Sequence, residues 1–311
     1  MYFSRVNIMN MRILITGATG LVGEAIVKQC HRNNINVNYL TTQKHKIIKK
    51  ENYHGFYWNP KTQDIDKTCF RHVSAIIHLA GATISKRWTS TYKKEIISSR
   101  IDSSKLLFHT LSKIDHNINH IISASAIGIY PHSLTRLYTE DSTGSSTSFL
   151  GHVVDLWENC IDDFSKINMS ISKIRIGLVL SNKGGALMKI VKPITFGIGA
   201  EFGSGKQWQS WIHIEDLSRL FIHVLQHRLE GVFNGVAPTP VTNNKLTKEI
   251  AKALKKPLFM PNIPKILMQT VLGDMHILLF ESQKVSAKKI EAHGFSFKYC
   301  DISLALENLL M

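Results

Sequence analysis

Short apolar runs alternate with longer amphipathic stretches along the first 180 residues of the chain. The apolar runs have the length of buried strands, and the amphipathic stretches have the spacing of helices. Strands are expected at Arg12–Thr16, Asn36–Thr41, Phe56–Trp58, Ser74–Leu79, Ile118–Ser123 and Ser170–Leu180, and helices at Leu21–Arg32, Thr91–Ser112 and Ser148–Ile167. This alternation predicts βαβ units, and therefore an α/β fold with a doubly wound parallel sheet, a Rossmann domain, over residues 11–180.

The pattern becomes less regular beyond residue 180, where a glycine-rich stretch from 184 to 205 is followed by shorter elements. Helices are expected at Ile214–Gln226, Thr242–Leu254, Pro264–Leu272, Gln283–Ala292 and Ile302–Leu310, and short strands at Gly231–Asn234 and Phe295–Lys298. We expect residues 181–311 to form a smaller mixed α/β domain that caps the carboxyl edge of the sheet. A ligand would then lie in the crevice between the two parts.

Three glycines, Gly17, Gly20 and Gly23, are spaced three residues apart between the first strand and the first helix. In that context the pattern is typical of a phosphate-binding loop, although a glycine-rich turn without a ligand is the alternative. Gly17 would allow the tight turn, Gly20 would let the pyrophosphate approach the backbone, and Gly23 would let the helix pack against the strand. The helix N-terminus would offer free N–H groups to the phosphates. The cofactor-binding residues expected in this loop are Thr16, Gly17, Thr19, Gly20, Leu21, Val22 and Gly23.

The end of the second strand bears on the choice of cofactor. An NAD enzyme usually has Asp or Glu there to accept from the ribose 2′-hydroxyl, but this chain has no acid before Glu51. A 2′-phosphate would instead meet the hydroxyl of Thr42 and the cations of Lys44 and Lys46. This composition favours NADP(H), and a basic, solvated loop is the alternative.

The formal net charge of +15 permits an anionic cofactor, a nucleic acid or simply a basic surface. The densest basic run, at 44–50, has no aromatic residue to stack on bases, so nucleic-acid binding is not expected. No apolar run approaches the roughly 18–20 residues of a membrane span. The four cysteines lie far apart, which argues against a metal site and suits a reducing cytosol. We therefore expect a cytoplasmic protein with a small-molecule substrate.

The first ten residues, Met1–Asn10, lack the apolar stretch of a secretory signal. The first expected strand begins directly after Met11, and an unpaired terminal segment rarely contributes to a fold. We expect Met1–Asn10 to be dispensable.

Several further motifs follow one another in a specific order. They are His78-Leu79-Ala80-Gly81-Ala82, Ser123-Ala124-Ser125-Ala126-Ile127-Gly128-Ile129-Tyr130, Trp157-Glu158, Arg175-Ile176-Gly177-Leu178-Val179-Leu180 and Trp211-Ile212-His213-Ile214-Glu215-Asp216. With the phosphate loop they resemble the extended short-chain dehydrogenase/reductase superfamily. More narrowly, the chain resembles the atypical "epimerase family" proteins related to nucleotide-sugar epimerases. The likeness spans about 11–310, and the segment at about 262–311 is similar to that family's own C-terminal domain.

The resemblance implies roles for residues outside the phosphate loop. It implies that Leu79, Ala80 and Gly81 line the cofactor, and that Leu178 approaches the nicotinamide ring. Arg100 occupies the place where the superfamily often has a catalytic asparagine, and we include it among the cofactor-binding residues.

The superfamily's catalytic pair is missing from this chain. A tyrosine and a lysine four residues later normally transfer the proton, but Leu150 and Val154 stand at those positions. Ser125 matches the superfamily's substrate-binding serine, and with His213 and Tyr130 it is a candidate proton donor. One hypothesis is an NADP(H)-dependent oxidoreductase or epimerase-like enzyme with a non-standard donor. The other is a non-enzymatic dinucleotide sensor or interaction protein.

A segment from 203 to 211 carries Lys206, Gln207, Trp208 and Trp211 close to His213. These side chains would suit the wall of a substrate pocket. The alternative is a structural loop whose tryptophans are packed in the interior.

Overall fold

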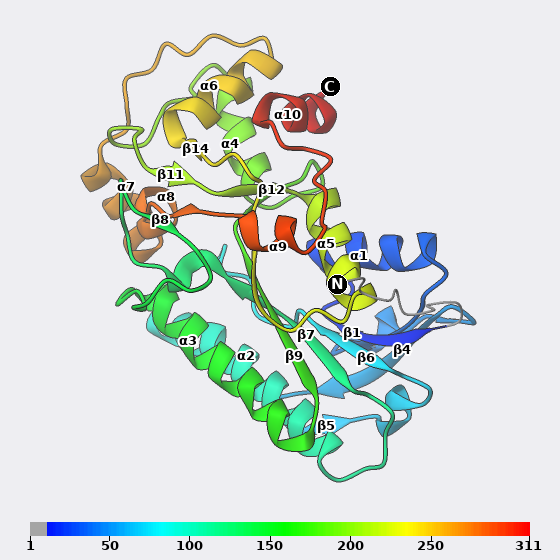
Figure 1. Cartoon of the computed structure of the whole chain (residues 1–311). Helices are drawn as coiled ribbons and strands as arrows, with labels where there is room; N and C mark the ends of the chain where they lie inside the picture. Colours follow the sequence, from blue (N-terminus) through cyan, green and yellow to red (C-terminus); the bar gives the residue numbers. More distant parts are fainter. Residues whose placement is uncertain (1–10) are drawn as a thin grey trace.

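A large sheet runs through the centre of the computed structural model, which describes residues 11–311 (Figure 1). The strands of this sheet are β1 Arg12–Thr16, β2 Asn36–Thr41, β3 Lys49–Lys50, β4 Tyr53–Asn59, β5 Asp64–Ile65, β6 Ala75–His78, β7 His120–Ala126, β9 Ser170–Ile176 and β13 Gly231–Gly235. They follow the order β13, β9, β7, β6, β1, β2, β4 and β3, with β5 paired to β4 beside this path. The expectation about Met1–Asn10 lies outside the described residues.

All neighbouring strands of this sheet are parallel except β3 and β5, which pair antiparallel with β4. The chain builds outward from β1 through β2 and β4, then crosses back to β6 on the other side of β1 and continues to β7, β9 and β13. The point where the order reverses lies between β1 and β6. In doubly wound sheets ligands bind at the carboxyl ends of the strands at such a point.

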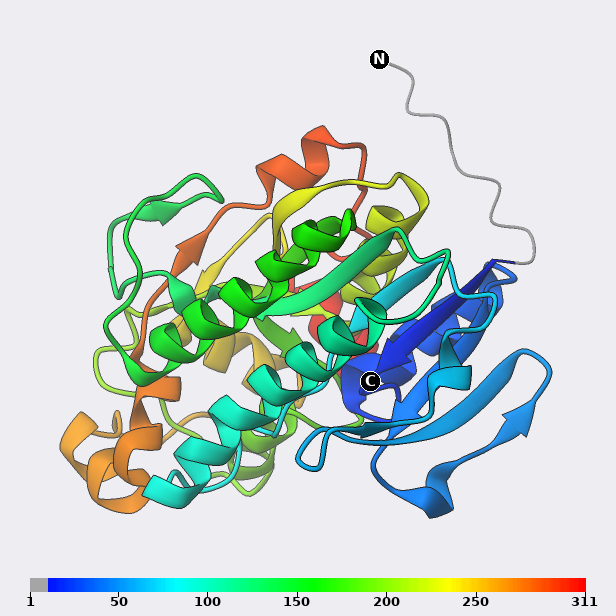
Figure 2. The same cartoon turned by 90° about the horizontal axis from the view of Figure 1, so that it is seen from below.

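Helices cover both faces of the sheet (Figures 1 and 2). On one face α1 Leu21–Arg32 packs against α5 Ile214–Gln226, and on the other α2 Ser90–Leu111 packs against α3 Phe149–Asp162. Because both faces are covered, the central strands have almost uninterrupted apolar runs such as Ile13–Ile15 and Ala75–Ile77. The expected Rossmann fold is therefore confirmed.

The C-terminal region adds small sheets and short helices beyond the carboxyl edge. Its strands, with their partners, are β10 Leu178–Leu180 with β12 Trp211–His213, β11 Trp208–Gln209 with β14 Val241–Thr242, and β8 Leu137–Tyr138 with β15 Lys284–Val285. The helices are α4 Ala186–Thr195, α6 Asn243–Ala253, α7 Lys265–Leu272, α8 Ile277–Phe280, α9 Lys288–Ala292 and α10 Ile302–Leu310. One 3-10 turn, η5 Gly273–His276, belongs to this region, and four others lie earlier in the chain, namely η1 Lys44–Lys46, η2 Lys67–Phe70, η3 Ile127–Ile129 and η4 Asp163–Ile167. A second apolar core joins α4, α6 and α10 around Trp211.

The expected boundary at residue 180 is not where the Rossmann sheet ends. The strand β13 pairs with β9, and α5 lies against α1, so residues 214–235 return to the large sheet. The expected single strand from 170 to 180 also divides in two. The N–H of Gly177 still bonds Gly235 of β13, but the N–H of Leu178 bonds Ser210, and β10 pairs with β12. A Cβ on Gly177 would lie 2.1 Å from the carbonyl oxygen of Ser210, so this close approach requires glycine.

Two further expectations about the C-terminal region are wrong, and one helix was missed. The helix expected at Gln283–Ala292 begins only at Lys288, because β15 occupies Lys284–Val285. The segment 295–298 is not a strand. The helix α4 was not expected, because glycines surround it and Pro193 lies inside it. Within residues 11–311, no helix is long and apolar enough to cross a membrane.

Candidate functional site

The phosphate loop has the geometry that its glycines suggested. Gly17 has a φ of +70°, and a Cβ there would lie 3.1 Å from the carbonyl carbon of Leu79. A Cβ on Gly23 would lie only 2.2 Å from the oxygen of Gly17, so α1 packs against the loop without room for a side chain. Gly20 differs, because its φ of −91° and ψ of 171° suit any residue. The backbone angles of Gly20 therefore do not require glycine, and a Cβ there would meet only the Gly17 oxygen, at 3.3 Å.

The loop leads into α1 with Gly20 at the N-cap and no side chain that bonds the first turn. The helix therefore offers the N–H groups of Leu21, Val22 and Gly23 without a side-chain acceptor. Such a terminus favours an anion through both its free donors and the helix dipole. This end of α1 fits the pyrophosphate of a dinucleotide.

Thr16 and His78 tie the ends of β1 and β6 together beneath the loop. The Thr16 hydroxyl oxygen accepts from the backbone N–H groups of Leu79 (3.0 Å) and Ala80 (3.1 Å), and its hydrogen is free to bond His78 Nδ1 at 2.8 Å. The proton of the ring then lies on Nε2, which is 3.1 Å from the Ser104 hydroxyl. Burial lowers the pKa of His78 to about 3, and the charge of Arg100 adds to the effect. The uncharged imidazole thus links the hydroxyls of Thr16 and Ser104. The sequence did not predict this structural role for His78.

A cavity of about 420 Å³ opens beside the phosphate loop. Five of the expected cofactor-binding residues line it, namely Gly17, Thr19, Thr42, Ala80 and Gly81. The other lining residues are Leu40, Thr41, Gln43, Trp58, Asn59, Pro60, Lys61, Ala82, Glu95, Ser99, Asp102 and Ser103. The cavity thus extends from the loop across the end of β2 to the β4–β5 turn and α2.

The cation that lines this cavity is Lys61, which the sequence did not single out. The expected Lys44 is not among the lining residues, and its ammonium group lies 4.9 Å from the centre of the Tyr57 ring. Thr42 and Gln43 line the cavity at the end of β2, where no acid is present. The carboxylates of Glu95 and Asp102 reach the cavity from α2, and Lys61 lies 3.9 Å from Glu95.

Arg100 lies directly behind Gly81. A Cβ on Gly81 would be 3.0 Å from the guanidinium carbon, so a side chain there would require Arg100 to shift. The guanidinium donates to the carbonyl oxygens of Ile96 (2.9 Å) and Ala82 (3.3 Å) and lies over the Trp157 ring. Burial lowers the pKa of Arg100 to about 10, so it remains a cation at neutral pH. Arg100 supports the cavity wall from behind and does not line it.

Ser125 belongs to a buried polar cluster between β7, β9 and α3. Its hydroxyl donates to Glu158 at 2.5 Å, and Arg175 holds the same carboxylate through two bonds of 2.9 Å. Arg175 also bonds the Tyr130 hydroxyl at 3.1 Å, and that hydroxyl donates to Asn234 at 2.8 Å. The structure thus brings together two of the three candidate donors, but both hydroxyls are already engaged.

The ionisation states in this cluster are set by burial and pairing. Burial would raise the pKa of Glu158, but the hydrogen bonds and charge of Arg175 bring it below its usual value. Burial raises the pKa of Tyr130, against the lowering effect of Arg175. Glu158 is therefore a weak base and Tyr130 a weak acid at neutral pH.

The positions of the missing catalytic pair are apolar in the structure. Val154 is buried in a cluster with Tyr130 and Tyr138. Leu150 is half-buried and packs with Trp88 and its neighbours. The helix face that carries tyrosine and lysine in the superfamily therefore cannot transfer a proton here.

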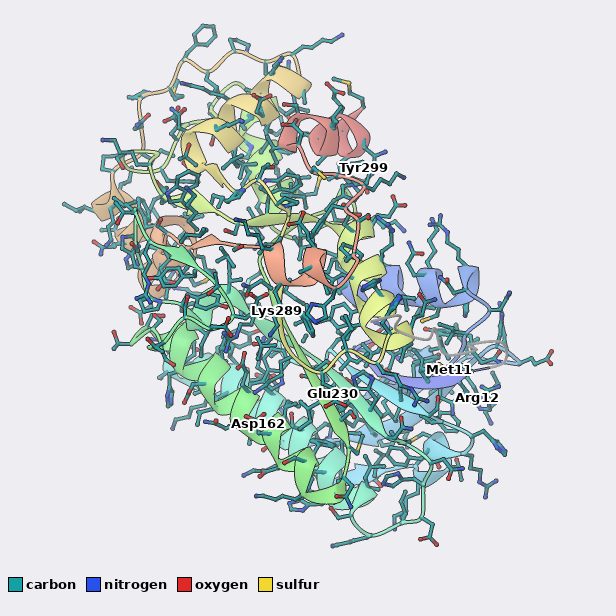
Figure 3. The ribbon with its side chains drawn as sticks, in the orientation of Figure 1. Met11, Arg12, Asp162, Glu230, Lys289 and Tyr299 are labelled. Carbon is teal, nitrogen blue, oxygen red and sulfur yellow. The ribbon has the colours of Figure 1, made fainter. Side chains whose placement is uncertain are left out.

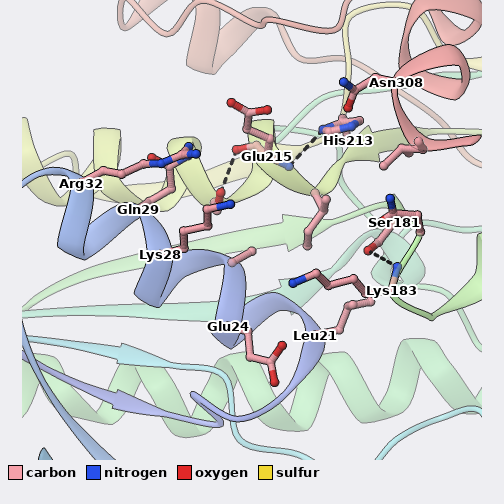
Figure 4. Close-up of a pocket in the computed structure, with 15 residues that line it drawn as sticks. Leu21, Glu24, Lys28, Gln29, Arg32, Ser181, Lys183, His213, Glu215 and Asn308 are labelled. Atoms are coloured by element: carbon pink, nitrogen blue, oxygen red, sulfur yellow. Dashed lines mark hydrogen bonds between the residues drawn. The ribbon is translucent and has the colours of Figure 1, made fainter. Parts of the chain in front are cut away.

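His213 does not line the cavity beside the phosphate loop. It caps α5, because its Nδ1 accepts from the backbone N–H of Glu215 at 3.1 Å, and its ring stacks on Tyr299 at 3.8 Å. Tyr299 precedes α10 (Figure 3). The residues around His213 form a second pocket, to which Leu21 contributes its side chain (Figure 4). The parallel pairing of β10 with β12 determines this placement, since it sets His213 opposite Leu180 and leaves Leu178 two residues earlier on that strand.

The segment at 203–211 is mainly structural. Trp211 is fully buried and donates to the carbonyl oxygen of Thr239, and the Gln207 amide bonds the carbonyl oxygens of Phe202 and Leu279. The packed-loop alternative therefore describes both residues. Within residues 11–311, no group of three His, Cys, Asp or Glu side chains is arranged to hold a metal ion.

Family models and individual relatives both match this chain. The NAD-dependent epimerase/dehydratase family matches residues 13–149, and a domain of unknown function, DUF1731, matches residues 263–309. An epimerase family protein of Staphylococcus epidermidis is 36% identical over 304 residues, which cover 96% of this chain and 99% of the relative.

Two solved structures of similar proteins also match the fold of this chain over almost its whole length. Human epimerase family protein SDR39U1, determined with NADPH, matches with a TM-score of 0.83 and 27% identity over 96% of this chain and 99% of that one. A nucleoside-diphosphate sugar epimerase of Corynebacterium glutamicum matches with a TM-score of 0.77 and 26% identity over 98% of this chain and 59% of that one. The chain belongs to the epimerase family, a group of NAD(P)-binding proteins with the Rossmann fold of the NAD-dependent epimerases and dehydratases.

Proposed function

We propose that this protein binds NADP(H) in the cavity beside the phosphate loop and acts on a small molecule as an oxidoreductase or epimerase-like enzyme. The observation that carries the proposal is the continuity of the cavity. It joins Gly17, where a side chain would not fit, to Thr42 and Lys61 at the end where a 2′-phosphate would lie. A dinucleotide with a 2′-phosphate would use both ends of this cavity.

The preference for the phosphorylated cofactor rests on the end of β2. Thr42 and Gln43 supply donors there, and Lys61 supplies a cation. An unphosphorylated ribose would lack the acidic acceptor that NAD enzymes usually place at this position. The NADPH in the structure of the human relative supports the same preference.

The protein's own residues divide the work of binding and positioning. Thr16 holds the Leu79 and Ala80 amides and so shapes the strand end on which the dinucleotide would lie. The Ser125–Glu158–Arg175 cluster fixes α3 against β7 and β9. When bound, NADP(H) would supply hydride-transfer chemistry, and the proton would have to come from a group other than a Tyr/Lys pair.

A second candidate is a non-enzymatic sensor of the cofactor or an interaction protein. The state of the expected donors favours it. Ser125 bonds Glu158, Tyr130 bonds Asn234 and Arg175, and His213 lines a different pocket. Neither hydroxyl is free to reach a substrate without breaking a buried bond.

Turnover separates these two candidates. Purified protein would be mixed with NADPH and a panel of aldehydes, ketones and nucleotide sugars, and cofactor oxidation followed at 340 nm (the reduced nicotinamide absorbs near that wavelength). For epimerisation, product isomers would be resolved by chromatography. Saturable turnover of one substrate supports the enzyme. Tight NADPH binding without turnover of any class supports the sensor, and no binding of NADPH refutes both.

A further inference from the structure

Two loops and one helix of the C-terminal region carry large apolar side chains on the surface. Phe259 is 77% exposed, Ile266 75% and Phe196 71%. A single exposed apolar side chain is common in proteins, but a group of them marks a surface that contacts a partner. We call this group the apolar patch; it consists of Phe196 and Ile198 after α4, Phe259 and Met260 between α6 and α7, and Ile266 and Leu267 in α7.

The segments that carry the apolar patch lie side by side. The backbone N–H of Ile263 donates to the carbonyl oxygen of Glu201 at 2.8 Å, and the N–H of Gly203 donates to the carbonyl oxygen of Ile263 at 2.9 Å. The bridge between Phe202 and Ile263 is parallel, so the chain before it comes from the same side in both segments. Figure 1 shows the segment between α6 and α7 on the outside of the C-terminal region, away from the large sheet. The six side chains therefore belong to one surface.

The fold makes no use of the outer face of α7. None of the residues of this helix is buried, and in the described part of the chain only Leu272 of α7 packs against an apolar core. The helix is anchored from its C-terminal end, because Met275 of η5 is buried in the same cluster as Trp88. This anchoring leaves Ile266 and Leu267 at the surface.

Lysines surround the apolar patch, and few acids balance them. Residues 186–206 and 245–271 contain nine lysines, two glutamates and no other charged residue. Both glutamates are engaged within the protein, since Glu201 accepts from the Asn244 amide at 2.6 Å and Glu249 accepts from the Ser303 hydroxyl at 2.9 Å. The lysines nearest the patch in sequence are exposed and, over residues 11–311, form no ion pair with a carboxylate; they are Lys192, Lys255, Lys256 and Lys265.

This combination of apolar side chains and positive charge favours the surface of an anionic membrane as the partner. A bilayer accepts apolar side chains at the boundary between its headgroups and acyl chains, while its anionic headgroups attract lysines. A second copy of the chain would bring the same positive charge to the contact and would be repelled. A nucleic acid would use the lysines but would leave the aliphatic side chains of α7 in water.

We propose that the protein binds reversibly to anionic membranes through this surface, with the apolar patch entering the interface and the four lysines contacting the headgroups. The binding is peripheral, because within residues 11–311 no helix is long and apolar enough to cross a membrane. The patch shares no residue with the lining of the cavity beside the phosphate loop. The inference therefore goes beyond the proposed function and does not depend on it.

The test is sedimentation of the full chain with vesicles of phosphatidylcholine alone and with vesicles in which about a third of the lipid is phosphatidylserine. We expect saturable binding to the anionic vesicles, at least about tenfold tighter than to the neutral ones, and weaker when the salt concentration is raised. No binding to the anionic vesicles, or equal binding to both kinds, would overturn the proposal.

Phe259→Ser and Ile266→Ser test the apolar part of the surface. Each should weaken binding to the anionic vesicles by about threefold or more, because each removes apolar area from the interface. Both side chains are exposed, so the circular dichroism and the melting temperature should be unchanged. Ile48→Ser is the matched control, since Ile48 is also exposed but precedes β3 at the far edge of the large sheet. Wild-type affinity in both patch variants, or an equal loss in the control, would overturn the proposal.

Lys255→Gln and Lys256→Gln test the charge. Each should weaken binding to the anionic vesicles by about fivefold at low salt, because each removes one cation beside the headgroups. Lys113→Gln is the control, since Lys113 is an exposed lysine that follows α2, outside the two basic segments. An equal loss in this control would mean that the net charge alone drives binding, and the proposal would fail.

A last measurement separates the membrane from the other partners. Self-association would be followed by analytical ultracentrifugation, and binding of duplex DNA by gel shift, for the unmodified chain and for Phe259→Ser. We expect neither to depend on Phe259. If Phe259→Ser abolishes self-association or DNA binding while vesicle binding is absent, the surface belongs to that partner and the membrane proposal is overturned.

Discussion

Two glycines of the phosphate loop should respond to alanine to different degrees in stability. At Gly20 the backbone angles are ordinary, and a Cβ would lie 3.3 Å from the Gly17 oxygen, a close contact that a small shift relieves. At Gly23 the Cβ would lie 2.2 Å from that oxygen and 2.7 Å from the Cα of Ala18, so the backbone itself must move. Gly20→Ala should therefore leave the protein folded without its cofactor site, and Gly23→Ala should disturb both.

The magnitudes follow from these contacts. Gly20→Ala loses a favourable N-cap residue, which costs about 0.5–1 kcal/mol. Gly23→Ala gains about 1 kcal/mol of helix propensity, but the displaced backbone costs more than this, so a net loss of roughly 1–3 kcal/mol is expected. Both variants should weaken NADPH by at least about tenfold, which is about 1.4 kcal/mol.

Urea denaturation would measure stability, and fluorescence titration would measure NADPH affinity. Gly128→Ala is the control for stability, since its Cβ would meet Leu150 at an ordinary 3.5 Å. If Gly23→Ala is more stable than the parent, the close packing of α1 on the loop is wrong. If Gly20→Ala keeps full NADPH affinity, the space above the loop does not hold the pyrophosphate.

Three more predictions concern charge. Lys61→Gln should weaken the binding of NADPH by about threefold to tenfold and leave the binding of NADH unchanged, whereas Lys44→Gln should change neither affinity. Parallel titrations with the two cofactors test this, and equal losses of affinity for both would count against a 2′-phosphate at Lys61. Glu158→Gln should cost roughly 3 kcal/mol in urea denaturation, because Arg175 is left buried without its carboxylate, and a loss below about 1 kcal/mol would contradict that. The pKa of His78 in the folded protein is about 3, so as the pH falls below about 6.5 only the unfolded chain takes up a proton at this histidine. The contribution of His78 to the free energy of unfolding is therefore complete above about pH 6.5 and should fall by about 1.4 kcal/mol for each pH unit below it. A free energy of unfolding that does not fall between about pH 6.5 and 5.5 would contradict this.

The first β–α–β unit was predictable to the residue. Arg12–Thr16, Leu21–Arg32 and Asn36–Thr41 have the same bounds in the sequence interpretation and in the structure. Each strand there is a buried apolar run, and glycines mark the turn between strand and helix, so local pattern and tertiary environment agree. The phosphate loop was predictable for the same reason, because close contacts within the loop and with the neighbouring strand end require its glycines.

Residues that depend on distant pairing were not predictable. Lys61 reaches the cavity only because β4 and β5 form a hairpin at the edge of the sheet. The pairing of β10 with β12 sets His213 opposite Leu180 and away from the cavity lining. The bond from Ser125 to Glu158 joins positions 33 residues apart. None of these contacts has a signal in the spacing of residues along the chain.

The central claim is that the cavity binds a dinucleotide with a 2′-phosphate, and one measurement tests it most directly. Dissociation constants for NADPH and NADH would be measured on the same preparation by fluorescence titration at constant salt. The cation and the donors at the end of β2, and the lack of an acid there, predict tighter binding of NADPH by about tenfold to a hundredfold, or roughly 1.5–3 kcal/mol. Equal dissociation constants for the two cofactors, or no binding of either, would contradict the account.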